Sequence, residues 1–170
     1  MSSRIHPSAY IAPTAAVMGQ VTLEEDSSVW YGAVIRADLA PVVIGAQTNL
    51  QDGSIVHVDE DMPCVVGPRV GVGHRAILHG CTIEEECLIG MGAVLLNEVH
   101  VGAGSVVGAG SVIPERMRIP PGSLVIGVPG RIVRTVDAAL AERVTATWKR
   151  YVELARSHRS GRYPLEAPSH

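Results

Sequence analysis

The sequence contains very few aromatic residues: no phenylalanine, two tryptophans and four tyrosines among 170 residues. Its apolar share of 46% comes chiefly from valine, isoleucine and other aliphatic residues, and glycine is abundant, with 18 copies. A core that lacks large rings must be narrow, and β-branched side chains pack best on the pleated surface of strands. The composition therefore predicts a narrow core that is lined by strands.

Long apolar runs and clusters of basic residues are also missing. No stretch approaches the roughly 20 apolar residues of a membrane-spanning helix, and the first residues lack the apolar run of a signal peptide. The net charge is −3, so there is no electrostatic reason to expect binding to nucleic acid or to a membrane surface. We therefore expect a soluble cytoplasmic protein.

Cysteine is scarce as well. Cys64, Cys81 and Cys87 are odd in number and show no CxxC spacing. Disulfide frameworks and thiolate zinc sites both require paired cysteines, so the sequence indicates neither. We expect Cys87 to be a small residue of the core.

An internal repeat is the strongest pattern that the sequence does contain. Aliphatic residues recur every six positions from Ile5 to Ile35, and the period continues to Ile113 after short interruptions. Most of them are followed four positions later by a small or medium-sized residue. Six residues make one short strand and a turn, so three hexapeptides close a triangular coil of about 18 residues, and coils stack at about 4.8 Å. The predicted fold class is β, a parallel β-helix of hexapeptide repeats.

The pattern changes towards the C-terminus. Prolines and glycines interrupt regular structure between residues 119 and 131. Beyond them, apolar residues follow helical spacing at Leu140, Val144, Trp148, Tyr151, Val152 and Ala155. We predict a β-helix domain over 1–131, one amphipathic α-helix within 132–160 and a loose tail over 161–170. The helix can pack along the β-helix or against a partner subunit, and the pattern does not choose between them.

Three histidines inside the repeat indicate a metal site. His57 and His79 each directly follow the aliphatic residue on the third face of a coil, and Arg36 holds the same position one coil earlier. The 22 residues from one histidine to the other equal one coil plus an insertion of four. His57 and His79 should therefore be stacked neighbours that point outwards and share a metal ion.

His74 belongs to a different face. It lies two positions after Val72, on the second face, in a column with Asp52. A triangular prism turns a corner between the two faces, so His74 should point away from the other two histidines of its own chain. The three imidazoles meet only where the second face of one subunit contacts the third face of another, and this contact closes as a C3 trimer with three equivalent sites. Three protein ligands with an open fourth position are typical of catalytic zinc.

Four stretches resemble the γ-class carbonic anhydrases and their bacterial hexapeptide-repeat relatives. They are IRADLAPVVIG from Ile35, NLQDGSIVH from Asn49, GHRAILHGC from Gly73 and IGMGA from Ile89, and they cover nearly the whole repeat. The resemblance implies a left-handed parallel β-helix with one C-terminal α-helix, assembled as a homotrimer. It also implies the reversible hydration of CO2 to bicarbonate.

The resemblance assigns roles to individual residues. It makes His57 and His79 of one subunit, and His74 of its neighbour, the metal ligands. It implies that Gln51 hydrogen-bonds the metal-bound water or hydroxide and that Asn49 helps to orient CO2.

The resemblance also concerns the charged residues around the ligands. Arg36 resembles the arginine that pairs with acidic residues matching Asp38 and Asp52, and this pairing ties the subunits together beside the metal. For Arg36 and Asp52, a structural role competes with a catalytic one.

The sequence departs from the best-studied members of this family in its acidic residues. Those members place a proton-shuttling glutamate just after the Arg-x-Asp pair, where this chain has Leu39. Their long acidic loop is reduced here to 59–61, in which Glu60 is the candidate substitute. This departure predicts that CO2 hydration is slow.

Metal chemistry accounts for the implied reaction. Zn²⁺ lowers the pKa of its bound water from about 15.7 to about 7, so that hydroxide is available to attack CO2 at neutral pH. Three imidazoles and a water suit Zn²⁺, Fe²⁺ or Co²⁺, and the sequence does not choose among them.

Three other functions stay open. Many hexapeptide-repeat proteins are acyltransferases, although these usually rely on one histidine as general base. A metal-activated hydroxide can also hydrolyse the thioester of an acyl-CoA. Finally, the metal can hold a non-catalytic trimeric scaffold together.

Overall fold

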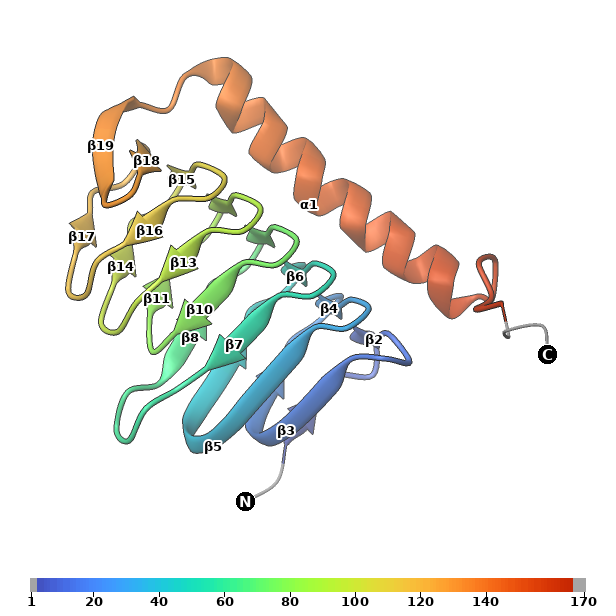
Figure 1. Cartoon of the computed structure of the whole chain (residues 1–170). Coiled ribbons are helices and arrows are strands. Elements are labelled where there is room, and N and C mark those ends of the chain that lie inside the picture. The colour runs from blue at the N-terminus through green and yellow to red at the C-terminus, as the bar shows by residue number, and fades with distance from the viewer. Residues whose placement is uncertain (1–2, 167–170) are drawn as a thin grey trace.

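The computed structural model describes residues 3–166 and is shown in Figure 1. Short coils stack into a three-sided prism, and within these residues one helix, α1 (Ala138–Arg159), runs alongside it (Figure 1). The arrangement confirms the predicted β-helix of hexapeptide repeats with a C-terminal helix.

The strands form three faces, which we call the first, second and third face in chain order. The first face contains β1 (Arg4–Ile5), the C-terminal parts of β3 (Ala16–Leu23) and β5 (Val34–Ile44), β8 (Cys64–Val66), β11 (Thr82–Ile83), β14 (His100–Val101) and β17 (Arg118–Ile119). The second face contains β2 (Tyr10–Ile11), β4 (Ser28–Val29), β6 (Asn49–Leu50), β9 (Gly71–Val72), β12 (Leu88–Ile89), β15 (Val106–Val107) and β18 (Ser123–Gly127). The third face contains the N-terminal parts of β3 and β5, with β7 (Ile55–His57), β10 (Ile77–His79), β13 (Val94–Leu95) and β16 (Val112–Ile113).

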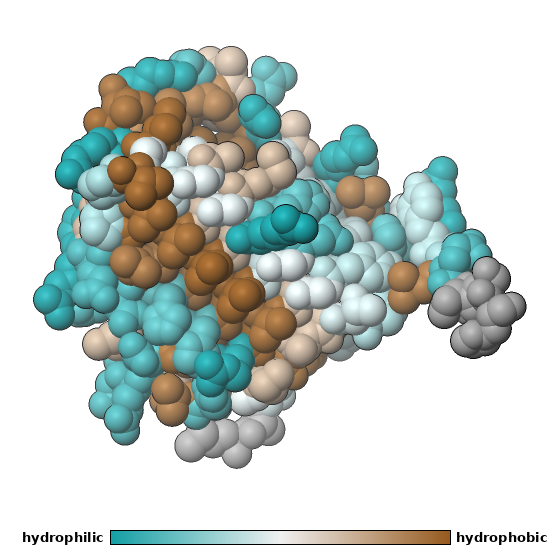
Figure 2. All heavy atoms as spheres, in the orientation of Figure 1, coloured by the Kyte–Doolittle hydropathy of each residue, from teal (hydrophilic) through white to brown (hydrophobic). Residues whose placement is uncertain are grey.

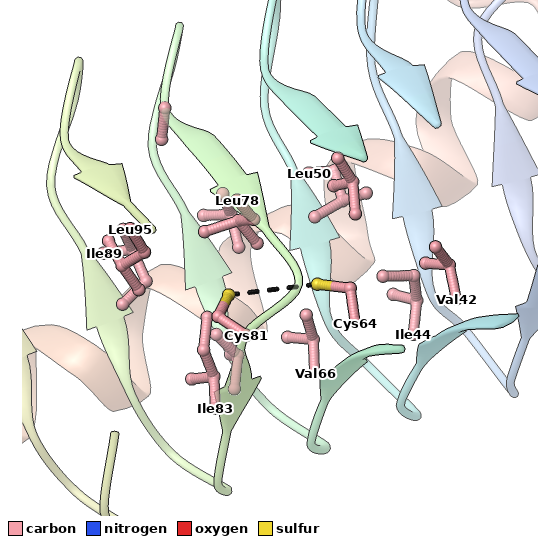
Figure 3. Close-up of a cluster of buried hydrophobic side chains, with 14 of the residues drawn as sticks. Val42, Ile44, Leu50, Cys64, Val66, Leu78, Cys81, Ile83, Ile89 and Leu95 are labelled. Atoms are coloured by element: carbon pink, nitrogen blue, oxygen red, sulfur yellow. Dashed lines mark hydrogen bonds between the residues drawn. The ribbon is translucent and has the colours of Figure 1, made fainter. Parts of the chain in front are cut away.

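Neighbouring coils pair in parallel, so equivalent residues form straight columns along the prism. On the third face the inward column contains Ile35, Val56, Leu78 and Leu95, and each of these side chains is 0% exposed. Figure 3 shows aliphatic side chains of several coils meeting in this interior. The main core cluster consists of aliphatic residues, alanines and cysteines, which confirms the predicted narrow core.

The three cysteines belong to this core, and all of them are buried and free. Cys64 and Cys81 lie in neighbouring coils with their Sγ atoms 3.9 Å apart (Figure 3). Burial raises the pKa of the Cys87 thiol to about 12. Cys87 is therefore the small core residue that the sequence predicted.

Helix α1 packs on the second face, against β2, β4, β6 and β9 (Figure 1). It begins after Asp137, whose carboxylate accepts a hydrogen bond from the backbone N–H of Leu140 at 2.9 Å. This bond lowers the pKa of Asp137, as expected for a carboxylate that caps a helix N-terminus. The buried residues of α1 are Val144, Val152 and Ala155, which follow the predicted apolar spacing.

The few aromatic side chains attach α1 to the outside of the prism. Trp30 of the second face packs against Tyr151 and His158 of α1, with ring centroids 5.2 and 5.0 Å apart. The hydroxyl of Tyr31 lies 2.9 Å from Nδ1 of His158. The rings thus occupy the junction between helix and prism, where the narrow core does not restrict their size.

The C-terminal boundaries are as follows. The strand β19 (Gly130–Thr135) pairs antiparallel with β18. It spans the boundary between the β-helix domain and the helical segment that was predicted at 131/132. Within the predicted segment 132–160, α1 covers Ala138–Arg159. Of the predicted tail, residues 167–170 lie outside the described part of the chain. Among residues 3–166, no helix combines the length and apolar character needed to cross a membrane.

Candidate metal centre

The outward column of the third face brings two of the predicted ligands together. Strand pairing aligns Arg36 with His57, and His57 with His79. Nδ1 of His57 lies 3.0 Å from Nε2 of His79, and the two ring centroids are 5.0 Å apart. Two imidazole nitrogens therefore converge on one point beside the prism.

The other ring nitrogens of this pair face oxygen atoms. Nε2 of His57 lies 3.2 Å from Oδ1 of Asp38, and Nδ1 of His79 lies 2.5 Å from Oδ1 of Asn97. Carboxylate and amide oxygens only accept hydrogen bonds, so the imidazole protons belong on these outer nitrogens. The converging nitrogens, Nδ1 of His57 and Nε2 of His79, are then left with lone pairs.

Asp38 is a charged partner of this pair. Its carboxylate accepts hydrogen bonds from the guanidinium of Arg36 and from His57. Desolvation raises the pKa of Asp38, but the hydrogen bonds from Arg36, from its own backbone and from His57 together bring the pKa below its usual value. Asp38 is thus held as a carboxylate that orients His57.

The second face carries the third predicted ligand. Nδ1 of His74 lies 3.0 Å from Oδ2 of Asp52, and its Nε2 lies 3.4 Å from the hydroxyl of Tyr151. Burial, and then the charge of Asp52, raise the pKa of Tyr151, so the hydroxyl stays protonated. The His74 side chain is 43% exposed, and its Nε2 faces the Tyr151 hydroxyl.

Gln51 and Asn49 are buried beside His74. The side-chain Nε2 of Gln51 donates a hydrogen bond to Oδ1 of Asn49 at 3.0 Å, and Nδ2 of Asn49 points to the carbonyl of Val70 at 3.4 Å. Gln51, His74 and Tyr151 line one part of a groove of about 510 Å³ between the second face and α1. Because Nε2 of Gln51 is bound to Asn49, its carbonyl oxygen is the end that can accept a hydrogen bond from water.

The chain therefore holds two separate parts of the predicted site. One part contains His57, His79 and Arg36, and the other contains His74 with Asp52. Among residues 3–166, no three His, Cys, Asp or Glu side chains are grouped so as to hold a metal ion. His74 is thus not brought to the pair within one chain.

The residues of the third face fit a divalent metal ion. Ligand nitrogens at about 2.0–2.1 Å from a tetrahedral zinc lie about 3.3 Å from each other, close to the 3.0 Å between Nδ1 of His57 and Nε2 of His79. Histidine ligands commonly donate their second N–H to a carboxylate or carbonyl oxygen, as both histidines do here. His74 likewise has a carboxylate oxygen, Oδ2 of Asp52, on its Nδ1, while its Nε2 faces the hydroxyl of Tyr151.

One residue of the short acidic loop at 59–61 is hydrogen-bonded to a residue that contacts the histidine pair. Leu39 is 52% exposed, and Glu60 is exposed in the loop. Asp59 instead accepts a hydrogen bond from Nδ2 of Asn97 at 2.9 Å, and Asn97 contacts His79. The structure thus links Asp59 to the histidine pair.

Sequence reasoning missed Tyr151 and Asn97 as site residues. Tyr151 had the helical spacing of a packing residue, and nothing in the spacing distinguishes it from its neighbours. Asn97 stands 18 residues after His79, one coil later, but an asparagine in a tight turn is ordinary.

Comparison with known proteins identifies relatives of the chain. The family of bacterial transferase hexapeptide repeats (six repeats) matches residues 80–115. The mitochondrial gamma carbonic anhydrase 2 of Arabidopsis thaliana is 38% identical over 157 residues, which cover 89% of this chain and 56% of that protein. A carbonic anhydrase of Geobacillus kaustophilus is 36% identical over 150 residues, which cover 88% of this chain and 82% of that protein. The chain thus spans about half the length of the plant relative and most of the bacterial one.

A solved structure supports the fold. The crystal structure of the BC4754 gene product of Bacillus cereus, assigned as an acetyltransferase, has 35% sequence identity and a TM-score of 0.91. The match covers 93% of this chain and 92% of that chain.

Proposed function

The chain belongs to the gamma carbonic anhydrase family, and we propose that it catalyses the reversible hydration of CO2 to bicarbonate with a divalent metal ion. In this proposal His57 and His79 of one subunit and His74 of a neighbouring subunit hold the ion. The active assembly is a homotrimer with three shared sites. Zn²⁺ is the proposed ion, and Fe²⁺ and Co²⁺ suit the same ligands.

The approach of the two histidine nitrogens carries this proposal. Nδ1 of His57 and Nε2 of His79 lie 3.0 Å apart, and the oxygen partners of the outer nitrogens leave both with lone pairs. Two lone pairs at this distance repel each other unless a proton or a metal cation lies between or beside them. His57 and His79 would hold a divalent ion through these two nitrogens.

The surface beside the histidine pair supports assembly from several copies. The outward column next to it on the third face contains Val34, Ile55, Ile77, Val94 and Val112, which strand pairing aligns in this order. Figure 2 shows an apolar band across this face, and Ile55 is 41% exposed. A second copy covers this column when its second face approaches, and the same contact brings His74 to the pair.

The remaining residues of the site bind and orient the reactants. A bound ion of this kind supplies the Lewis acidity that makes water a nucleophile near neutral pH. With such an ion bound, the carbonyl oxygen of Gln51 would accept a hydrogen bond from the attacking water and orient it. Asn49 holds Gln51 in place through the 3.0 Å hydrogen bond and helps to orient CO2.

The charged residues have supporting roles in this proposal. Asp38 orients His57 at 3.2 Å, and Asp52 orients His74 at 3.0 Å. Arg36, which is bound to Asp38, lies at the contact between subunits and pairs there with Asp52 of the neighbouring copy. Glu60 is the proposed proton acceptor, because it is exposed in the loop next to the histidine pair.

A combined metal and activity measurement tests the proposal. Protein purified without added metal is analysed for zinc and iron, and CO2 hydration is followed by stopped flow from about pH 7 to pH 9. We expect about one divalent ion per subunit, and loss of both ion and activity in His57→Ala. His100→Ala is the matched control, since His100 lies on the first face with its Nε2 2.8 Å from Oε1 of Glu84. A loaded trimer that is no faster than the metal-free protein contradicts the proposal.

Thioester hydrolysis is a second candidate function. The groove of about 510 Å³ next to His74 is lined by apolar residues, including Leu88, Val106 and Leu124, and such a lining suits an acyl chain. Hydrolysis of acyl-CoA compounds of increasing chain length, measured on the same samples, separates this activity from CO2 hydration. Acyl transfer and a non-catalytic scaffold are tested by the same samples, and the cytoplasmic location stays a prediction from the sequence.

A further inference from the structure

Asn97 connects a metal ligand to the acidic insertion. Its side-chain oxygen lies 2.5 Å from Nδ1 of His79, and its side-chain nitrogen donates a hydrogen bond to Oδ2 of Asp59 at 2.9 Å. Both contacts are partly buried. The three side chains come from the turn after β13, the end of β10 and the loop after β7, which places them in successive coils.

The carboxylate of Asp59 determines where the protons lie in this chain of hydrogen bonds. A carboxylate only accepts, so Asn97 must present its NH₂ group to Asp59 and its oxygen to His79. His79 must then carry its proton on Nδ1 and keep the lone pair on Nε2, the atom that faces His57. With the amide reversed, Asn97 would instead favour the other tautomer, in which Nε2 is protonated and cannot bind a metal.

The local backbone is shaped to allow these contacts. Gly80, directly after His79, has a φ of +51°, and a Cβ added there would lie 2.9 Å from Oδ1 of Asn97. Any other residue at this position therefore pushes Asn97 away from His79. In the insertion after β7, the backbones of Asp59 and Met62 form an isolated antiparallel β-bridge. This bridge fixes the backbone of Asp59, whose carboxylate lies next to Asn97.

We propose that Asn97 and Asp59 are positioning residues that hold His79 in its metal-binding tautomer and orientation. This inference rests on the proposed function for the identity of the bound group. In this inference the insertion after β7 serves to place Asp59, which acts on His79 through Asn97. The neighbouring ligand His57 contacts the carboxylate of Asp38 directly.

Metal affinity of the purified protein tests the inference. Zinc dissociation constants are measured by competition with a chromophoric chelator for the wild type, Asn97→Ala, Asp59→Asn and Asp61→Asn. Loss of a partner that orients a ligand typically weakens metal binding about 10- to 100-fold, and we expect this loss in Asn97→Ala and Asp59→Asn. Asp61→Asn is the matched control, because it removes the same charge from the same exposed loop. Wild-type affinity in Asn97→Ala overturns the inference.

An exchange of the two side chains distinguishes positioning from general damage. The double variant Asn97→Asp/Asp59→Asn places a carboxylate on His79 and an amide behind it, with the same net charge. It should recover most of the affinity that Asp59→Asn loses, whereas a merely structural role predicts that the two changes add.

Imidazole ¹⁵N spectra of the metal-free protein report the tautomer of His79 directly. We expect the proton on Nδ1 in the wild type, and a shift towards the Nε2-protonated form in Asn97→Ala. An unchanged tautomer overturns the inference. A wild type that binds no divalent ion contradicts the proposed function instead, and the tautomer then decides whether Asn97 positions His79.

Discussion

Mixed trimers provide the sharpest test of a metal site that is shared between subunits. His74→Ala removes the proposed ligand of the second face and leaves the pair on the third face intact. His57→Ala removes one member of the pair and leaves His74 intact. In a C3 trimer, each site takes His74 from one subunit and the pair from the next. Neither variant alone can then form a complete site, but a mixture can.

The arrangement sets the size of the expected recovery. A complete site requires an intact His74 on one side of the contact and an intact pair on the other. With equal amounts of the two variants and random assembly, each condition is met about half the time, so about one quarter of all sites are complete. A site formed within one chain predicts no recovery at all.

The assay combines co-expression with two different affinity tags, so that mixed trimers are isolated separately from the two parents. Each mixed trimer has one complete site among its three, so in the isolated mixed trimers bound zinc and CO2 hydration should both rise from near background to about one third of the wild-type value, which corresponds to about one quarter over the unseparated mixture. Light scattering confirms that parents and mixtures are trimers. If either parent retains wild-type zinc, or if the mixture only averages the parents, the shared site is refuted.

Three further predictions concern assembly and stability. Ile77→Glu places a charge in the apolar column of the third face and should dissociate the proposed trimer in sedimentation experiments, whereas Thr82→Glu on the first face should not. Leu78→Ala creates a cavity at a fully buried position and should lower the free energy of unfolding by about 2–5 kcal/mol in urea; a change well below this range contradicts the packing. Asp137→Ala should lower Tm at neutral pH, because the capping carboxylate has a lowered pKa in the folded chain. That difference is full above the ordinary pKa of about 3.9 and is lost as the pH falls through the lowered value; a difference that does not depend on pH contradicts it.

The prism and its columns were predictable because the period of the sequence sets them. Each coil pairs with the next through backbone hydrogen bonds, so residues that share a position in the repeat must lie above one another. Counting from Ile35 through Val56 to Leu78 was enough to place Arg36, His57 and His79 in one column, as strand pairing now confirms. The same counting placed His74 with Asp52, and these side chains lie 3.0 Å apart.

The contacts that cross between segments were not predictable in this way. The packing face of α1 was visible in its spacing, but the second face as its partner was not, because every face of the prism offers similar outward residues. Trp30 of the second face packs against Tyr151 and His158 of α1. This packing holds α1 on the second face and brings Tyr151 to His74. The insertion has no period, so the sequence, which named only Glu60 as a candidate there, could not show that Asp59 accepts a hydrogen bond from Asn97.

A six-residue period thus determined the fold, the narrow core and the faces on which the histidines lie, because hydrogen bonding between coils converts spacing along the chain directly into position. Tertiary structure decided which side chains touch: Asn97 with His79, Asp59 with Asn97, and Tyr151 with His74. These contacts depend on side-chain conformation, on a loop without a repeat and on a helix far away in the sequence, and none of them follows from periodicity.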